Sequence, residues 1–217
     1  MIHSFSQVEG VYIERVEGQE RLAYSLSDRD DFYDMLEWQE QGGYQGATLT
    51  FYDLQTGTVD RPFPKMKNVM YGTPVYLEDA VFFLQGNFDI GKVTLFRYTQ
   101  ETGARPVTEL NIEEIDLLNL KIIGEQVHII SQDRKVHCYY PETFSFDLAG
   151  NETVELISDG KVYIEAWIEE GWDTEKDAPT ENYKFYHNLI LKDFEGNTLS
   201  EEKGQLYHSA DGSWWIS

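Results

Sequence analysis

One carboxylate in this sequence occupies a position suited to acid–base chemistry. Hydrolysis of a glycosidic bond requires two carboxyl groups, one as the acid and one as the base or nucleophile. When the strands expected before the tight acidic turns are aligned on those turns, Glu155 is the one carboxylate among the inward-pointing positions, and Lys121 shares its row. We therefore favour a structural ion pair. A carbohydrate-active enzyme that uses Glu155 is the alternative, and it requires a second acid from residues 111–117 to approach Glu155.

Other chemistry-bearing residues predict neither a metal nor a cofactor. His128 and His137 would lie on one face of a hairpin without a third ligand, which disfavours a zinc site. Residues 84–91, LQGNFDIG, lack the alternating oxygen ligands of a calcium loop. The sequence contains neither a phosphate-binding glycine loop nor a nucleophile elbow. The lone cysteine, Cys138, fits a buried strand position better than a catalytic thiol. We expect no cofactor, and catalysis is the less favoured function.

Short recurring segments predict the elements that would position these side chains. A triplet of one β-branched or aromatic residue, one aromatic residue or His, and one aliphatic residue or Phe occurs five times. Each copy follows a tight acidic turn such as Asp159-Gly160, and Asp-Gly is a strong hairpin signal because glycine takes positive φ easily. The triplets are residues 11–13, 81–83, 127–129, 162–164 and 214–216. Five hairpins are therefore expected.

A third strand with its own turn follows most of these hairpins. It reads LTFY from Leu49, LFRY from Leu95, HCYY from His137 and LILK from Leu189, at spacings of 46, 42 and 52 residues. A turn comes next, with glycine in three of the four copies, and it leads to a fourth strand. A period in the forties with four strands per unit is typical of propeller blades.

The turns of the first two units carry a resemblance to a known class. FYDLQTG, residues 51–57, and RYTQETG, residues 97–103, resemble the Asp-x-x-Thr-Gly turns of quinoprotein-type and related β-propeller repeats. The Trp-Asp pairs of the WD40 class and the Gly-Gly pattern of the kelch class are absent, and no cofactor ligand can be carried over. The resemblance covers most of the chain and concerns architecture alone.

The expected fold is one all-β domain over residues 1–217. It is a propeller-like array of four-stranded antiparallel blades, with about five repeat units, the last one partial, and one short inserted helix. We expect residues 1–6 to lie beside the C-terminal hairpin at residues 205–217 and to close the ring. The alternative is an open arc whose free sheet edge is covered by a second copy, giving a homodimer.

Two long connections, residues 18–46 and 169–181, distinguish the first and fourth units. In the first, Ser27 suits a helix N-cap, acidic residues follow it, Phe32 and Met35 begin an apolar stripe, and Gly42-Gly43 ends the helix. The second has no periodicity and is strongly acidic, which favours a mobile, solvated loop. Propeller topology would put both connections on one face of the molecule.

This face is the candidate binding surface, because aromatic anchors there are surrounded by acids. A helical lid on the blade rim and a solvated loop are the simpler interpretations of the same segments. The candidate residues are Asp30, Asp31, Asp34, Trp38, Tyr44, Glu169, Glu170, Trp172 and Asp173. Asp30 and Asp31 are expected in the first helical turn.

Composition narrows the function further. The chain of 217 residues is 41% hydrophobic, which is enough for a sizeable core, and its net charge of −22 repels nucleic acid and anionic lipid. It contains neither a basic leader nor a run of apolar residues long enough to span a membrane, and the single cysteine permits a cytoplasmic location. We expect a non-catalytic binding or protein-interaction module with a cationic protein or small-molecule partner. A structural assembly subunit is a further alternative.

Overall fold

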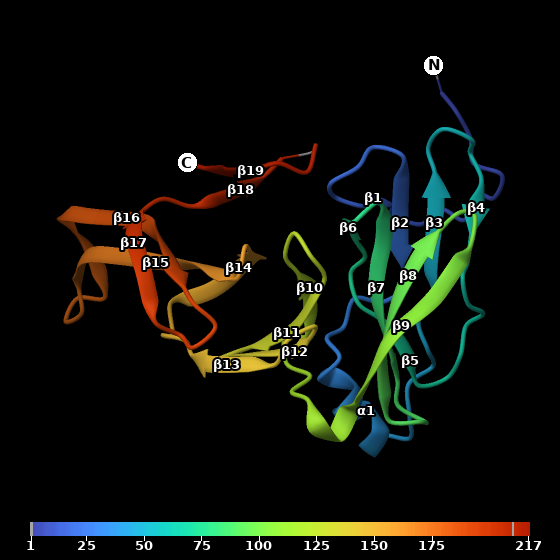
Figure 1. Ribbon diagram of the computed structural model, residues 1–217, viewed down its shortest axis with the longest axis horizontal. Helices are drawn as coiled ribbons and strands as arrows, with labels where there is room; N and C mark the ends of the chain where they lie inside the picture. Colours follow the sequence, from blue (N-terminus) through green and yellow to red (C-terminus); the bar gives the residue numbers. More distant parts are fainter. Residues whose placement is uncertain (1, 210) are drawn as a thin grey trace.

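The computed structural model describes residues 2–209 and 211–217, and the regular secondary structure of this part of the chain is almost entirely β (Figure 1). Successive strands pair in antiparallel fashion and form sheets of neighbours along the chain. The predicted all-β class is confirmed, and three of the sheets in the described residues are four-stranded and antiparallel, as expected of each unit. Within the described residues, no helix is both long and apolar enough to cross a membrane.

Four sheets follow one another along the chain, and a two-stranded hairpin ends it. The first sheet contains β1 (Glu14–Arg15), β2 (Leu22–Leu26), β3 (Leu49–Asp53) and β4 (Val59–Asp60); the second contains β5 (Val69–Tyr71), β6 (Val75–Leu77), β7 (Ala80–Asn87), β8 (Lys92–Thr99) and β9 (Gly103–Asn111). The third contains β10 (Lys121–Ile123), β11 (His128–Gln132), β12 (Lys135–Tyr140) and β13 (Phe144–Asp147); the fourth contains β14 (Glu152–Ser158), β15 (Lys161–Asp173), β16 (Ala178–Lys192) and β17 (Thr198–Lys203). The final hairpin is β18 (Leu206–His208) and β19 (Trp214–Ile216), and the helical elements are α1 (Asp34–Glu40) and the 3-10 turn η1 (Ile112–Glu114).

The recurring triplets mark buried strands in the middle three units. Residues 81–83 are buried in β7, residues 127–129 lie at the start of β11, and Val162 and Ile164 are fully buried in β15. Residues 214–216 do form β19, although Trp215 and Ile216 are exposed. Hydrophobic alternation therefore identified the packed strands correctly in these units.

The first triplet was assigned wrongly. Residues 11–13 are not in a strand, and the first hairpin is β1–β2, which turns at Gly18 with φ of 81°. The side-chain amide of Gln19 closes this turn, donating to the carbonyls of Val16 and Leu22 and accepting from the backbone N–H groups of Arg21 and Leu22. The Gln19 side chain thus stabilises the tight turn of this hairpin, whereas an Asp-Gly pair forms the turn in others. The true connection between β2 and β3 spans residues 27–48.

Two apolar clusters hold the sheets together. The larger joins the first two sheets, α1 and part of the third sheet, with Phe51 stacked on Tyr98 at a centroid distance of 4.3 Å. The smaller joins the third and fourth sheets and contains Ile130, Cys138 and Ile164. Burial raises the pKa of the Cys138 thiol to about 11, in agreement with a packing role.

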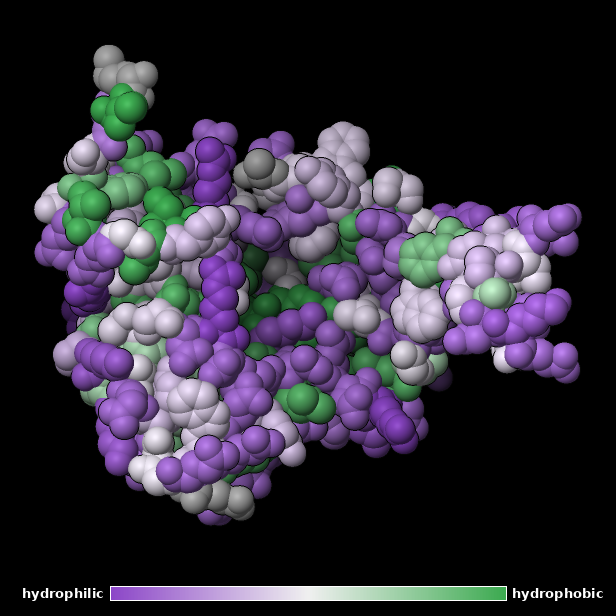
Figure 2. Space-filling model, turned by 180° about the vertical axis from the view of Figure 1, so that it is seen from behind, coloured by the Kyte–Doolittle hydropathy of each residue, from purple (hydrophilic) through white to green (hydrophobic). Residues whose placement is uncertain are grey.

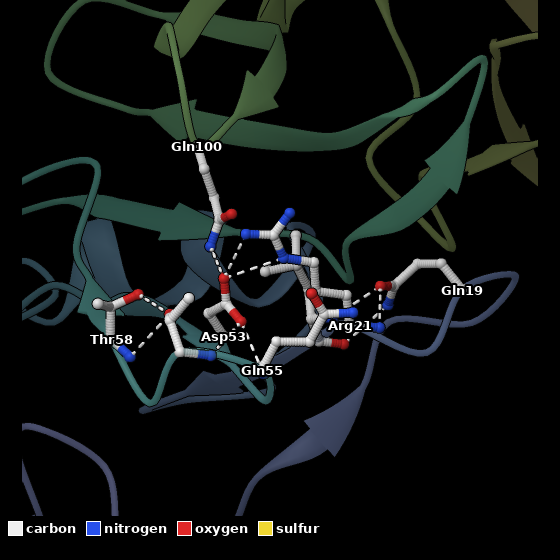
Figure 3. Close-up of polar contacts among 8 residues, drawn as sticks. Gln19, Arg21, Asp53, Gln55, Thr58 and Gln100 are labelled. Carbon is white, nitrogen blue, oxygen red and sulfur yellow. Dashed lines mark hydrogen bonds and ion pairs between the residues drawn. The ribbon is translucent and has the colours of Figure 1, made fainter.

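The repeated Asp-x-x-Thr-Gly turn connects the first sheet to the second. Asp53 Oδ1 accepts the backbone N–H groups of Gln55 and Thr56, while Oδ2 accepts Arg21 at 2.8 Å and Gln100 Nε2 at 2.6 Å (Figure 3). Gln100 lies in the corresponding turn of the second sheet. The two copies of the motif therefore bond to each other.

The chain ends are placed differently from the expectation. The N-terminal segment lies on the first sheet, where the Ser6 N–H donates to the Gly57 carbonyl and the Phe5 ring contacts Tyr52. The C-terminal hairpin lies well apart from it (Figure 1). It contacts the fourth sheet through the Leu206 N–H, which donates to Glu165 Oε1, and the first sheet through His208 Nδ1, 3.6 Å from Glu17 Oε2. The prediction that residues 2–6 lie beside this hairpin is wrong.

Candidate interaction surface

The hairpin of β15 and β16 extends beyond the rest of its sheet. β14 pairs with β15 only as far as Ala166, and β17 pairs with β16 only from Asn188 onward. Residues 167–187, which we call the arm, therefore form ladder pairs only with each other, and within the described part of the chain backbone bonds to the flanking segments are made only by the end residues Trp167 and His187. The arm projects at the left end of the molecule (Figure 1). The solvated loop expected at residues 169–181 is thus mostly paired strand.

Local sequence explains how the arm turns and where its side chains point. At the tip, Asp173 Oδ1 accepts the N–H groups of Glu175 and Lys176, and its Oδ2 pairs with Lys176 Nζ at 3.0 Å. Gly171 forms a bulge with φ of 75°, and a Cβ at this position would lie 2.8 Å from the Asn182 carbonyl oxygen. Glycine is therefore required, and the bulge reorients Trp172.

One face of the arm carries a row of aromatic side chains. Trp167 lies opposite His187, and Glu169 lies opposite Phe185. The Phe185 ring contacts His187 at 5.2 Å, and Tyr183 contacts Trp172 at 6.0 Å, both edge to face. The exposed fractions are 45% for Trp167, 39% for Trp172, 38% for Tyr183 and 55% for Phe185. Large rings that lie in a row and remain this exposed form a surface suited to binding.

Carboxylates accompany the rings, and two of them are held in place. The Tyr183 hydroxyl donates to Glu169 at 2.7 Å, and the Tyr186 hydroxyl donates to Glu170 at 2.8 Å on the opposite face. These hydrogen bonds to carboxylates raise the pKa of both tyrosines. Across the described arm the acids are Glu169, Glu170, Asp173, Glu175, Asp177 and Glu181, and the lysines are Lys176 and Lys184. The arm is therefore both aromatic and negatively charged.

Of the acidic candidates in the first connection, Asp34 is the first residue of α1, and Asp30 and Asp31 precede the helix. Asp34 Oδ2 accepts the Asp31 N–H at 2.9 Å, and Asp31 Oδ1 accepts the Tyr33 N–H at 2.9 Å. Asp31 Oδ2 also accepts the N–H of Asn119 at 3.2 Å, which connects this segment to the approach to β10. The helix starts at Asp34 because these bonds fix the residues before it in a turn. Asp30 and Asp31 therefore precede the helix instead of occupying its first turn.

The aromatic candidates of this connection are packing residues. Tyr44 is buried, its hydroxyl donates to Asp28 at 2.7 Å, and its ring lies edge to face with Trp38 at 4.6 Å. Phe32 fills a notch beside Gly72 and Gly86, where a Cβ on Gly86 would lie 2.8 Å from the ring. The segment folds against the second sheet, as the lid interpretation had it.

The two predicted halves of the binding face do not meet. α1 lies at the bottom of the view and the arm at its left end (Figure 1). Of the predicted residues, Glu169, Glu170, Trp172 and Asp173 lie together on the arm, and Asp30, Asp31, Asp34, Trp38 and Tyr44 lie apart from them. The prediction missed Trp167, Tyr183 and Phe185. For the second strand, the alternation of rings at Tyr183, Phe185 and His187 in NYKFYHN was the available signal.

The ion pair expected between Glu155 and Lys121 is not formed, because Lys121 Nζ donates to the Val154 carbonyl, but each of the two groups affects the pKa of the other. Burial raises the pKa of Glu155, the Lys121 charge opposes that rise, and Glu165 adds to it. Burial lowers the pKa of Lys121, and Glu155 opposes that change. The acids of residues 111–117 make contacts elsewhere: Glu114 accepts Asn111, and Asp116 accepts the Leu118 N–H. The neighbouring acid is instead Glu165, whose Oε1 accepts the N–H of Leu206.

Comparisons with known proteins identify no relative, so the choice of candidate site rests on the geometry of the structure. The chain matches no family model, no curated protein and no solved structure. Among the residues that the structure describes, no group of three or more His, Cys, Asp or Glu side chains is arranged to hold a metal ion. The arm is therefore the candidate site with the clearest geometry.

Proposed function

We propose that the protein is a non-catalytic interaction module that uses the arm to bind a basic segment of another protein. The observation that carries this proposal is the row of exposed rings at Trp167, Phe185, Tyr183 and Trp172, in which Tyr183 contacts Trp172 and Phe185 contacts His187. A soluble protein gains little from leaving such a row in water, and aromatic rings are the side chains that most often dominate binding energy. The four sheets and the final hairpin would form an incomplete five-unit propeller that supports the arm.

The charge of the arm specifies the chemistry of the partner. Six acids against two lysines attract a segment rich in Lys and Arg, and the rings can accept its aliphatic stems or a guanidinium plane. The held carboxylates, Glu169 and Glu170, are already oriented by tyrosine hydroxyls. They can therefore receive a cation with little loss of side-chain freedom.

Selection from a random peptide library displayed on phage tests this proposal, with Kd measured by biolayer interferometry on synthetic peptides. We expect selected peptides to be enriched in Lys and Arg around an apolar residue. Trp172→Ala and Phe185→Ala should each weaken binding about tenfold or more, as expected for anchors worth over 1.4 kcal/mol. Trp215→Ala, which removes a ring exposed by 62% on β19, is the matched control and should leave Kd unchanged.

Association kinetics distinguish the contribution of the acidic residues to binding from that of the aromatic rings. Reversing Glu169 and Glu170 to Lys should slow association and remove its dependence on salt, whereas reversing Glu201 and Glu202 on β17 should have a smaller effect. If selected peptides carry no excess of positive charge, or bind the Trp172 and Phe185 variants as tightly as the original protein, the arm is not the binding surface. Peptides that bind the edge of β19 would instead favour assembly through that strand.

A further inference from the structure

A second candidate site lies at the centre of the molecule, away from the arm. A cavity of about 530 Å³ is lined by β1, β6 and β10 of the first three sheets, together with residues 26–32 and 71–74. Seen from behind, the surface is hollowed between the part that carries the N-terminus and the part that carries the arm, with hydrophobic residues at the bottom (Figure 2). This volume is in the range of small-molecule sites.

The bottom of the cavity is apolar and fixed. Phe32, Leu84, Leu120 and Ile122 line it. Phe32 cannot shift easily toward the second sheet because its ring already fills the notch at Gly72 and Gly86. The cavity is therefore a preformed site for the apolar body of a ligand.

Most acidic groups on the wall already have partners. Glu14 forms an ion pair with Arg29 and accepts the Tyr24 hydroxyl at 3.1 Å. Both oxygens of Asp31 accept backbone N–H groups, and Glu17 contacts His208. Asp30 is exposed at the surface and interacts with Asp28. Glu14 and Glu17 thus contact basic side chains, Asp31 is hydrogen-bonded to the backbone, and Asp30 is exposed to water.

Two cationic side chains on the wall, by contrast, have no ion-pair partner among the described residues. Lys121 Nζ donates to the Val154 carbonyl at 3.2 Å, and although Glu155 acts on it electrostatically, no carboxylate of a described residue lies within ion-pair distance of it. Arg15, on β1, likewise has no ion-pair partner within the described part of the chain. Both line the same cavity, from different sheets. An ammonium and a guanidinium are thus available beside an apolar floor.

We propose that this cavity binds a small organic carboxylate, with the carboxylate near Arg15 and Lys121 and an apolar body on the floor formed by Phe32, Leu84 and Ile122. Arginine binds carboxylates through paired N–H groups, and charged hydrogen bonds are the stronger ones. Because the whole chain carries a net charge of −22, affinity must come from contact with these two cations rather than from long-range attraction. The site does not depend on the arm.

Isothermal titration calorimetry with three matched probes tests this inference: 3-phenylpropionate, 3-phenylpropanamide and 3-phenylpropylamine. The acid should bind at least about tenfold more tightly than the amide, the ratio expected for one charged hydrogen bond. It should also shift the methyl NMR signals of Leu120 and Ile122, and the amine should not. Binding of the amide or amine as tightly as the acid, or of no probe at millimolar concentration, would overturn the proposal.

Variants locate the anion. Arg15→Gln and Lys121→Met should each weaken binding of 3-phenylpropionate about tenfold and leave the amide unaffected. Arg134→Gln and Lys161→Met remove exposed cations outside the cavity and serve as controls. If Lys121→Met reduces folding, as judged by circular dichroism, Arg15→Gln decides alone because Arg15 is exposed. Equal loss in the control variants would show that the acid binds the surface nonspecifically.

Discussion

Asp53 should contribute several kcal/mol to folding although it lies in a turn. Its side chain is 1% exposed, and it accepts two backbone N–H groups, the Arg21 guanidinium and the Gln100 amide. Hydrogen bonds to a charged group are worth about 1.5–3 kcal/mol each. Arg21 is 48% exposed and would regain water, so its share is discounted. We expect Asp53→Ala to lower the free energy of unfolding by about 3 kcal/mol.

The pH dependence of this contribution follows from the same contacts. Burial alone would raise the pKa of Asp53, but hydrogen bonds from Arg21, Gln100 and the backbone outweigh it and hold the pKa well below its usual range. Its stabilising contribution is therefore complete above the unfolded pKa of about 3.9 and is lost as the pH falls from there toward the folded pKa. Asp53→Asn, which keeps the shape but removes the charge, should cost about 2 kcal/mol at pH 6 and progressively less below pH 4.

Urea denaturation followed by tryptophan fluorescence measures both effects. Asp147→Asn is the matched control, because its side chain is 85% exposed beside Lys135 and should change stability by less than about 0.5 kcal/mol. Two results would refute the reasoning. One is a loss below about 1 kcal/mol for Asp53→Ala. The other is a difference between wild type and Asp53→Asn that stays constant from pH 6 to pH 2.5.

Three further substitutions test the packing. Ile164→Ala empties a fully buried site and should cost about 2–5 kcal/mol in chemical denaturation; a loss below about 1 kcal/mol would contradict the assigned core face. Lys192→Met breaks a buried ion pair with Glu152 and should cost about 3 kcal/mol, whereas adding Glu152→Leu should recover most of the loss; an uncorrected double variant would contradict this account. Gly86→Ala should displace the Phe32 ring and lower the Tm by several degrees, and an unchanged Tm would show that the ring moves freely.

The sequence predicts the packed strands well, for a physical reason. In β7 and β15 hydrophobic side chains recur where the sheet faces the core, and tight turns at Glu78-Asp79 and Asp159-Gly160 precede these strands with positive φ. Both signals come from residues that are close together in the chain, so they can be recognised in a single sequence. The final partial unit was found in the same way, from Asp211-Gly212 and the strands around it.

The wrong predictions concern features that depend on side-chain contacts and on directions in space, which a local hydrophobic pattern does not contain. The Gln19 side chain closes the first hairpin, so the first unit begins further along the chain than the triplet at residues 11–13 predicts. Residues 169–181 have the sequence character of a loop because both faces of β15 are exposed beyond Ile168, so hydrophobic alternation stops there although the strand continues. The separation of the two connections depends on their directions in space, which spacing along the chain does not determine.

The arm also shows how one strand can serve both the core and a binding surface. In β15 the side chains of Val162, Ile164 and Ala166 are buried, and this packing fixes the direction in which residues 167–173 continue. An isolated two-stranded hairpin is marginally stable in water, so the ring contacts of Trp172 with Tyr183 also stabilise the arm itself. Loss of binding after truncating a ring therefore combines two effects. The charge reversals at Glu169 and Glu170 leave the rings in place, and their effect on association rate reports on recognition more directly.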